Sequence, residues 1–301
     1  MEQINKDLDR VIGFTIPAQN ARGRVVRLGP VLETILEAHA YPPAIEALLA
    51  EALTLTALVG STLKDADGQL TLQTQSEHGV VRLLVCDFRA GELRGYVQFD
   101  ADRLAAGPSD PTLFALFGQG YLAITFDMAT SGERYQGIVP LDGSRFSEAV
   151  QSYFSQSEQI PTLVRVGFAK QDGACISGGL LLQHLPEGED GRERLHTKLD
   201  HPEWEHVAAL AQTMGADELA DPALSLETLV WRLFNEEAEV RVLPATPVVK
   251  GCRCTADHIR SVLAKFPPSE QQAMADENGV IGVDCAFCST VFPIRADELV
   301  A

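Results

Sequence analysis

Four of the six cysteines lie in the last 50 residues of the chain and form two close pairs. The pattern is Cys252-x-Cys254, then 30 intervening residues, then Cys285-x-x-Cys288. Thiolates are strong ligands for Zn²⁺, and two close pairs separated by a long loop can surround one tetrahedral ion. Because no such site exists in an unfolded chain, metal binding would be coupled to folding. The spacing therefore predicts one zinc site made by these four cysteines.

The same two pairs can also be oxidised. A disulfide needs Cα atoms about 4.4–6.8 Å apart, and cysteines separated by one or two residues can meet that requirement. Thiolates are the oxidisable form of cysteine, so an oxidant could convert the zinc ligands into disulfides and expel the metal. The residues alone leave two interpretations open, a redox switch or a purely structural zinc ribbon, and the spacing favours the ribbon.

The two other cysteines and the N-terminus bear on the cellular compartment. Cys86 and Cys175 occur singly in apolar segments and are expected to be buried. The N-terminus is polar with no apolar segment after it, which predicts no secretory signal and a cytoplasmic protein with reduced thiols. The longest uncharged apolar stretch, Ala52 to Leu63, has 12 residues and is shorter than the roughly 20 that a membrane span needs.

Charge is distributed unevenly along the 301 residues. The chain has 42 Asp and Glu against 24 Lys and Arg, a formal net charge of −18. This balance argues against a nucleic-acid-binding surface and against attraction to anionic membranes, so neither partner is expected. The segment from Glu187 to Glu239 has 14 acidic and four basic residues and carries −10 of the total. A distinct acidic segment therefore precedes the cysteine pairs.

Residues 1–182 are predicted to form an N-terminal α+β core domain. Its second helix, Ala44 to Leu63, is apolar nearly all round and is expected to be buried. Alternating and β-branched segments predict strands. Helices flanking one largely antiparallel sheet would satisfy the order of these elements. The predicted strands are 69–75, 80–88, 93–99, 121–126, 134–139, 163–169 and 174–182.

Residues 183–245 are predicted to be an acidic helical linker. Asp200 and Ser225 are suited to begin amphipathic helices, for which Trp204 and Trp231 are the expected anchors. Such short helices are marginal in water and need another surface to cover their apolar faces. Residues 246–301 are predicted to be a C-terminal zinc-binding module. About 55 residues bury too little surface to form a stable fold unless a metal or a disulfide cross-links them.

The motifs together resemble the heat shock protein 33 family of redox-regulated holdase chaperones. Cys252-Arg253-Cys254 and Cys285-Ala286-Phe287-Cys288 match the Cys-x-Cys and Cys-x-x-Cys pairs of that family. The resemblance covers nearly the whole chain. One departure follows Cys254. The family usually has Ser-Arg-Glu/Asp-Arg there, whereas this chain has Thr255-Ala256-Asp257-His258. The four cysteine ligands are unaffected by this difference. Other matching stretches are Tyr41-Pro42-Pro43, 120–125, 135–141, 153–159 and 178–183.

The resemblance implies a mechanism. In the reduced state Cys252, Cys254, Cys285 and Cys288 hold one Zn²⁺, and the chaperone is inactive. Oxidation forms the disulfides Cys252–Cys254 and Cys285–Cys288, zinc leaves, and the C-terminal module and linker unfold. The family then dimerises and holds unfolding client proteins without ATP. The resemblance thus implies a redox-active chaperone of the stress response, a binding protein rather than an enzyme.

Two other functions fit parts of the pattern. A thiol–disulfide oxidoreductase could use Cys285 and Cys288, although such enzymes usually place the pair at a helix N-terminus after a strand. His258 lies near the pairs but is expected on the surface, because four sulfurs already complete a tetrahedron. A zinc-ribbon adaptor could bind nucleic acid, but the nearby basic residues are few: Lys250, Arg253, Arg260 and Lys265.

Overall fold

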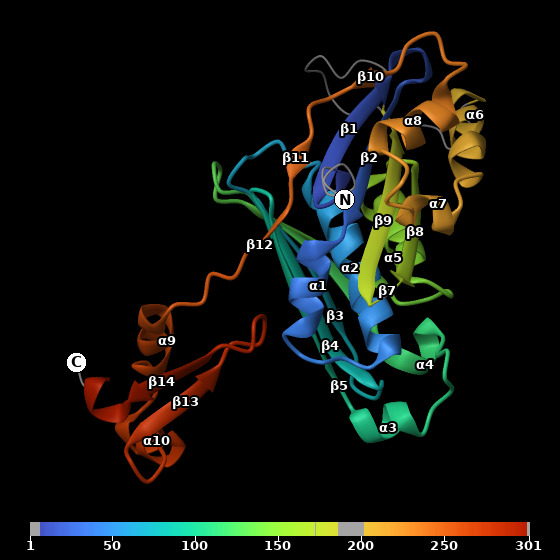
Figure 1. Cartoon of the computed structure of the whole chain (residues 1–301). Coiled ribbons are helices and arrows are strands. Elements are labelled where there is room, and N and C mark those ends of the chain that lie inside the picture. Colours follow the sequence, from blue (N-terminus) through green and yellow to red (C-terminus); the bar gives the residue numbers. More distant parts are fainter. Residues whose placement is uncertain (1–6, 172, 186–201, 300–301) are drawn as a thin grey trace.

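The computed structural model describes residues 7–171, 173–185 and 202–299, and two six-stranded sheets form its centre. One long helix, α2 (Pro43–Gly60), lies between the sheets and contacts strands of both (Figure 1). Every residue of α2 from Ala52 to Gly60 is buried, because a helix that is apolar on all sides needs partners on all sides. The α+β class and the buried helix are confirmed, whereas the prediction of a single sheet is wrong.

By length and composition, α2 could also cross a membrane, since its 18 residues have a mean hydropathy of 1.5. The apolar part of this helix is therefore longer than the stretch from Ala52 to Leu63 indicates. However, 72% of the 18-residue window is buried inside the fold. A fully apolar helix packed in this way is typical of a protein core.

The first sheet has the strand order β10-β1-β2-β9-β8, with β11 also paired to β1. Its strands β1 and β2 have no counterpart among the sequence-based predictions, because glycines and arginines interrupt their alternation. The inner face of this sheet packs on α2. The strands are β1 (Arg10–Ile16), β2 (Ala21–Leu28), β8 (Thr162–Gln171), β9 (Ala174–His184), β10 (Arg241–Val242) and β11 (Thr246–Pro247).

The second sheet has the order β12-β5-β4-β3-β6-β7 and covers the other side of α2. All its neighbours are antiparallel except β12, which runs parallel to β5. The predicted strands between residues 69 and 139 are confirmed. They are β3 (Gln69–Gln75), β4 (Val81–Arg89), β5 (Glu92–Phe99), β6 (Tyr121–Asp127) and β7 (Arg134–Pro140), joined by β12 (Val249–Lys250).

Short helices close the ends and edges of this double-sheet body. A half-buried aspartate fixes the start of one of them, since Asp9 accepts hydrogen bonds from the amides of Gly29 and Val31. A carboxylate suits the positive end of a helix. These helices are α1 (Pro30–Glu37), α3 (Ala101–Ala105), α4 (Leu113–Phe117) and α5 (Phe146–Tyr153), with short turns η2 (Pro17–Gln19) and η3 (Phe154–Glu158).

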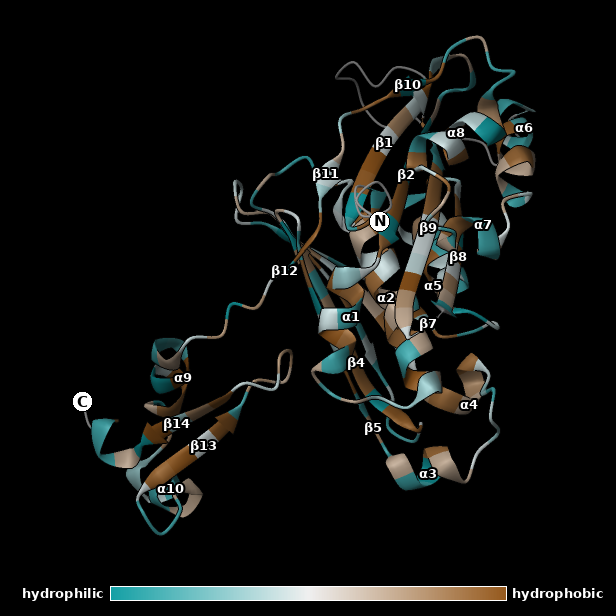
Figure 2. Cartoon of the chain, viewed as in Figure 1, coloured by the Kyte–Doolittle hydropathy of each residue, from teal (hydrophilic) through white to brown (hydrophobic). Residues whose placement is uncertain are grey.

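Three linker helices cover the outer face of the first sheet, namely α6 (Pro202–Gln212), α7 (Ala216–Ala220) and α8 (Leu226–Phe234). Their mixed teal and brown colouring in Figure 2 is that of amphipathic helices. Their apolar side chains join those of β1, β2 and β9 in one buried cluster, as the amphipathic pattern predicts. The side chain of Ser225 caps α8 as expected, accepting from the amide of Thr228, whereas Asp200 lies outside the described residues.

The two linker tryptophans differ from each other. Trp204 is partly buried against the cluster beneath α6, as an anchor should be. The expectation that Trp231 is also an anchor is wrong, because its side chain is 66% exposed. Trp231 lies on the other side of the helix from its buried residues, which are Leu226, Leu229, Val230, Leu233 and Phe234.

A row of three residues across β2, β9 and β8 supports α7. Arg27 pairs with Gly178, and Gly178 pairs with Gly167. The two glycines lie so close to α7 that an added Cβ would come within 2.0 Å of the Leu219 carbonyl oxygen or 1.9 Å of that of Ala216. Only a residue without a side chain allows the helix backbone this approach.

Arg27 completes this support from the end of the row. Its side chain is fully buried and donates hydrogen bonds to the carbonyl oxygens of Leu219 (2.9 Å), Glu218 (3.3 Å) and Leu224. Burial lowers the pKa of Arg27 to about 10, so it stays charged at neutral pH. A cation at the C-terminal carbonyls of a helix is favourable, and these bonds fix α7 to the core.

The C-terminal elements form a small separate unit beside this body (Figure 1). A two-stranded sheet packs with two helices around five buried residues, Ile259, Leu263, Ile281, Ile294 and Leu299. The division of the chain at residues 182 and 245 stays a prediction, and β11 and β12 on its C-terminal side pair with the large sheets. The unit contains α9 (Ala256–Leu263), α10 (Pro268–Met274), β13 (Val280–Asp284), β14 (Val291–Arg295) and η4 (Ala296–Glu298).

Candidate metal centre

The four C-terminal cysteines come together in space. Cys252 Sγ lies 3.2 Å from Cys254 Sγ and 3.6 Å from Cys285 Sγ, and Cys254 Sγ lies 3.5 Å from Cys288 Sγ. All four sulfurs lie within 4.8 Å of one another. Sulfurs placed 2.3 Å from one tetrahedral zinc ion would be about 3.8 Å apart, which falls within this spread. Among the residues that the structure describes, this is the one group of His, Cys, Asp or Glu able to hold a metal.

Each pair is positioned by a strand. One residue, Gly251, separates β12 from Cys252, and its amide donates to the Leu93 carbonyl of β5 at 2.9 Å. Cys285 and Cys288 lie in the turn between β13 and β14, where Cys288 N and Ser289 N both donate to the Cys285 carbonyl. The site therefore joins the end of β12 to the tip of a hairpin that is distant in sequence.

The apolar core around this site is small. Only five apolar residues are buried in the cluster between α9, β13 and β14. A core of this size stabilises a fold weakly unless a metal or a disulfide adds to it. A metal held by these four thiolates would tie the segment before α9 to the hairpin after α10, which closes the unit.

The thiols differ in acidity. Burial, followed by contact with the thiol of Cys252, raises the pKa of Cys254 far above its usual range, and burial also raises the pKa of Cys285. Burial acts in the same direction on Cys288, but hydrogen bonds from the hydroxyl and amide of Thr290 and from the thiols of Cys254 and Cys252 together outweigh it. They lower the pKa of Cys288 to about 6.

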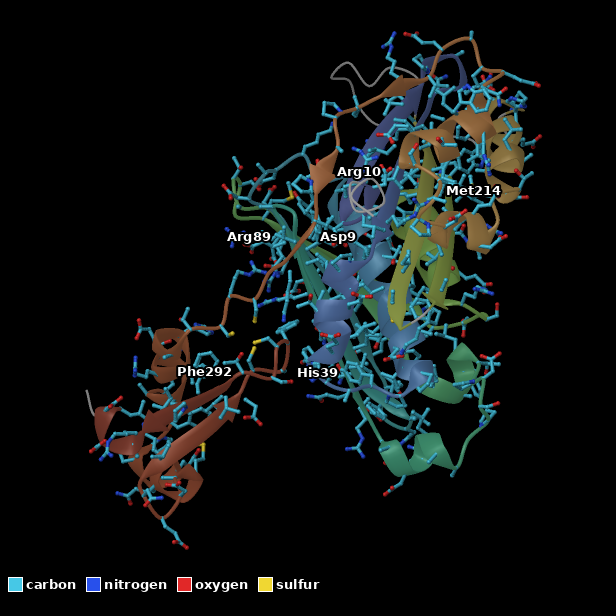
Figure 3. The ribbon with its side chains drawn as sticks, viewed as in Figure 1. Asp9, Arg10, His39, Arg89, Met214 and Phe292 are labelled. Carbon is cyan, nitrogen blue, oxygen red and sulfur yellow. The ribbon has the colours of Figure 1, made fainter. Side chains whose placement is uncertain are left out.

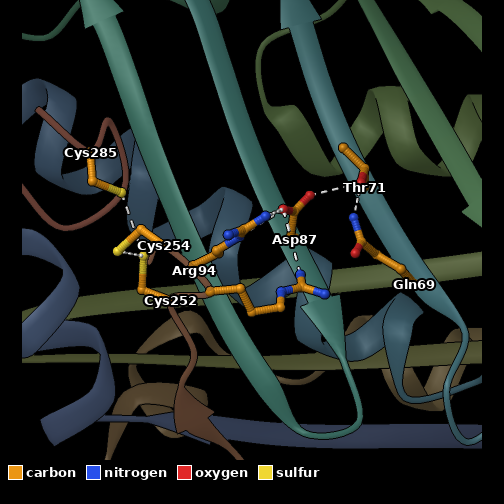
Figure 4. Close-up of polar contacts among 8 residues, drawn as sticks. Gln69, Thr71, Asp87, Arg94, Cys252, Cys254 and Cys285 are labelled. Atoms are coloured by element: carbon orange, nitrogen blue, oxygen red, sulfur yellow. Dashed lines mark hydrogen bonds and ion pairs between the residues drawn. The ribbon is translucent and has the colours of Figure 1, made fainter. Parts of the chain in front are cut away.

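The residues between the cysteines contact the outer face of the second sheet. The Arg253 guanidinium is 3.9 Å from the carboxylate of Asp87, which also accepts from Arg94 Nη2 at 2.6 Å and from Thr71 Oγ1 at 2.7 Å. Figure 4 shows Asp87 between Arg94 and Thr71, with Cys252 and Cys254 alongside. Sequence patterns gave no sign of Asp87 or Arg94 at this site, since only the sheet register brings them together.

The second pair contacts the same face. The Phe287 ring lies 4.0 Å from the Arg94 guanidinium and meets Tyr96 edge-on, with the ring centres 4.9 Å apart. Nearby, the hydroxyl of Ser289 lies 3.0 Å from His39 Nδ1, and Figure 3 shows His39 beside the sulfurs of the centre. Burial, the largest influence on His39, lowers its pKa. Both cysteine pairs thus touch the core at adjoining points.

The remaining sequence-based candidates lie elsewhere. His258 is exposed on α9, where its amide donates to the capping hydroxyl of Thr255, and it is not part of the sulfur cluster. Cys86 and Cys175 are buried in the main core, as predicted. The pair Cys285–Cys288 lies in a hairpin turn rather than at the start of a helix.

Comparisons with known proteins agree over nearly the whole chain. A family model described as Hsp33 protein matches residues 9–295. A 33 kDa chaperonin of Caulobacter vibrioides (strain NA1000 / CB15N) is 40% identical over 293 residues, which cover 95% of this chain and 94% of the relative. A 33 kDa chaperonin of Ectopseudomonas mendocina (strain ymp) is 36% identical over 289 residues, or 95% and 92% of the two chains.

A solved structure shows the same fold. The crystal structure of a 33 kDa chaperonin from Thermotoga maritima matches with a TM-score of 0.78 and 22% identity. The match covers 97% of this chain and 96% of the other. At this identity the match concerns the fold alone. Because it covers nearly the whole chain, it extends over the double-sheet body, the linker helices and the C-terminal unit.

Proposed function

The chain belongs to the Hsp33 family of chaperones, and we propose that it is a redox-regulated holdase that protects unfolding proteins from aggregation without ATP. The observation that carries the proposal is the cluster of four thiols at the junction of the C-terminal unit and the core. In the proposed resting state these thiols hold one Zn²⁺ and the protein is inactive. The homodimeric active state and the cytoplasmic location stay predictions.

In the proposed switch, an oxidant such as peroxide forms Cys252–Cys254 and Cys285–Cys288. As each disulfide forms, its two thiolates give two electrons to one molecule of hydrogen peroxide, which takes up two protons and becomes two molecules of water. Thiolates bind zinc and disulfides do not, so the ion is released. The C-terminal unit then loses its main source of stability, because its own apolar core has only five buried residues.

The linker supplies the surface that activation would expose. The helices α6, α7 and α8 cover apolar residues of β1, β2 and β9. If the linker leaves, the outer face of the first sheet and the apolar faces of the helices both become available to unfolding clients. Their exposure gives the protein a large hydrophobic surface in the oxidised state alone.

The proposed function is tested by following one oxidation reaction with three measurements. During a peroxide titration, zinc release, loss of free thiols and suppression of the aggregation of a heat-denatured client are expected to change together. Four thiols should disappear for each zinc ion released, since each of the four ligands enters a disulfide. Reduced, zinc-loaded protein is the control and should leave the client to aggregate.

Equal client protection by the reduced and oxidised protein would contradict the switch, and so would full activity with zinc retained. Catalytic turnover of a disulfide substrate would instead favour the alternative, a thiol–disulfide oxidoreductase using Cys285 and Cys288. Its pair differs from the usual arrangement, because a second pair lies against it and no helix begins there.

Zinc binding is expected to tighten as the pH rises from 7 to 8, because the metal replaces protons on its ligands. The pKa values of Cys254 and Cys285 are raised above this range, so at least these two thiols release protons on binding. The apparent affinity should increase about 100-fold or more over this pH unit. Competition with a chelator of known affinity at each pH measures it, and a pH-independent affinity would exclude these thiols as ligands.

A further inference from the structure

A narrow segment connects the linker helices to the metal centre. We call residues 241–251 the strap; it contains β10, β11 and β12, each only two residues long. β10 and β11 pair with β1 of the first sheet, and β12 pairs with β5 of the second. The strap therefore crosses from one sheet to the other, with α8 at one end and Cys252 at the other.

The strap holds to the core by few interactions of its own. Besides the short ladders of β10, β11 and β12, four of its amides donate to core carbonyls: Leu243 to Gly13, Val248 to Asp9, Val249 to Gly91 and Gly251 to Leu93, at 2.7–2.9 Å. Lys250 Nζ also donates to the Thr34 carbonyl. Apart from Val248, the apolar side chains along it are largely exposed. A segment with so little buried surface opens readily unless an end is fastened.

The metal centre provides that fastening through the residues between its cysteines. We propose that Arg253 and Phe287 dock the centre on the patch formed by Asp87, Arg94 and Tyr96, and that this docking holds the strap, and through it the linker, on the core. Arg253 and Phe287 are positioning residues, since neither is a thiol ligand. This inference rests on the proposed function, because it describes how the state of the centre reaches the linker.

The docking contacts come from both cysteine pairs, so both pairs must be in place for the centre to dock. Arg253 belongs to the pair after β12 and approaches Asp87, whereas Phe287 belongs to the β13–β14 turn and stacks on Arg94. Arg94 binds the same carboxylate with Nε at 2.8 Å and Nη2 at 2.6 Å, so the two contacts share one buried ion pair. A metal would join the two pairs directly, and its loss would leave only the small apolar cluster of α9, β13 and β14 to keep the Phe287 turn near Arg253 and the strap.

Two like charges meet at this patch, where Arg253 and Arg94 repel each other and Asp87 between them offsets that repulsion. The Asp87 side chain is only 5% exposed and has two cations directed at it, one from the core and one from the C-terminal unit. The Phe287 ring lies over the guanidinium that pairs with this carboxylate, where a cation–π contact adds to the ion pair. Losing the C-terminal unit removes one cation and one ring from the patch but leaves the Arg94–Asp87 pair, so the core itself remains intact.

The test compares hydrogen exchange of the strap amides in reduced, zinc-loaded protein. In the double variant Arg253→Ala/Phe287→Ala, protection of Val249 and Gly251 is expected to fall by about tenfold or more. Protection of Leu243, at the far end of the strap, should fall less. The control double variant Arg260→Ala/Phe266→Ala removes the same residue types from the same unit, where Arg260 pairs with Glu298 and Phe266 is 40% exposed.

A conservative variant and a core-side variant separate docking from folding. Arg253→Lys/Phe287→Tyr keeps a cation and a ring, and should restore protection. If the alanine variant does not hold zinc, Tyr96→Ser tests the same contact without changing the C-terminal unit, and should lower protection at Gly251. Protection equal to that of the control variant, at equal zinc content, would overturn the inference, as would full protection in the zinc-free parent protein.

Failure of the proposed function gives a different result. If the proposed function is wrong, the oxidised parent protein will not suppress the aggregation of a heat-denatured client. The exchange measurement is made on the reduced protein and needs no client, so it decides the docking inference in either case.

Discussion

Replacing Gly178 by alanine is expected to release the linker from the core while the protein is still reduced. The added Cβ would lie 2.0 Å from the Leu219 carbonyl oxygen, so α7 must move away from β9. The strand itself tolerates the change, because alanine suits an extended backbone at least as well as glycine. Overpacking of this kind costs about 1–3 kcal/mol, which shifts the docking equilibrium about 5- to 150-fold.

The release is measured by binding of a hydrophobic dye and by client protection without oxidant, both of which should increase. Zinc content should equal that of the parent protein, since Gly178 is distant from the sulfur cluster. Gly282→Ala is the matched control, because it changes a strand glycine whose added Cβ would meet no atom within 4 Å. A Gly178→Ala protein that binds no more dye than this control would show that α7 does not hold the linker in place.

Replacing Cys288 by serine is expected to weaken zinc binding, and therefore to unfold the C-terminal unit at free zinc concentrations that saturate the parent protein but not the variant. Structural zinc contributes about 10–16 kcal/mol in small domains, so losing one of four thiolates removes roughly a quarter of this energy. The affinity should then fall about 100- to 1,000-fold. With five buried apolar residues as its only other core, the unit around β13 and β14 should lose its fixed structure.

Loss of dispersed NMR signals from residues 256–299 measures this unfolding, with those of 10–171 retained because the double-sheet core is separate. Cys175→Ala is the control; it removes a thiol that is buried in the main core and lies outside the cluster. Zinc bound at the parent affinity by the Cys288→Ser protein would exclude Cys288 as a ligand.

The candidate site was predictable from the sequence to the extent that it depends on local spacing. Cysteines one or two residues apart are close in almost any conformation, so Cys252-x-Cys254 and Cys285-x-x-Cys288 indicate a metal site before any fold is known. The buried helix was also predictable, since α2 is apolar on every side. The fold was predicted less well. Strands β1 and β2 were missed because the reasons for their glycines and arginines are tertiary: Gly23 makes room for the ring of Phe14 on the neighbouring strand, and Arg27 bonds to α7.

The sequence by itself determined the four-thiol centre, the acidic linker and the amphipathic helices, because each follows from residues that are near one another in the chain. The tertiary structure alone decided what these parts touch. Arg27, Gly178 and Gly167 form one row only because β2, β9 and β8 pair in that register. Arg253 meets Asp87 only because β12 pairs with β5 and β5 with β4. Contacts between distant segments depend on strand order and register, which local spacing does not encode.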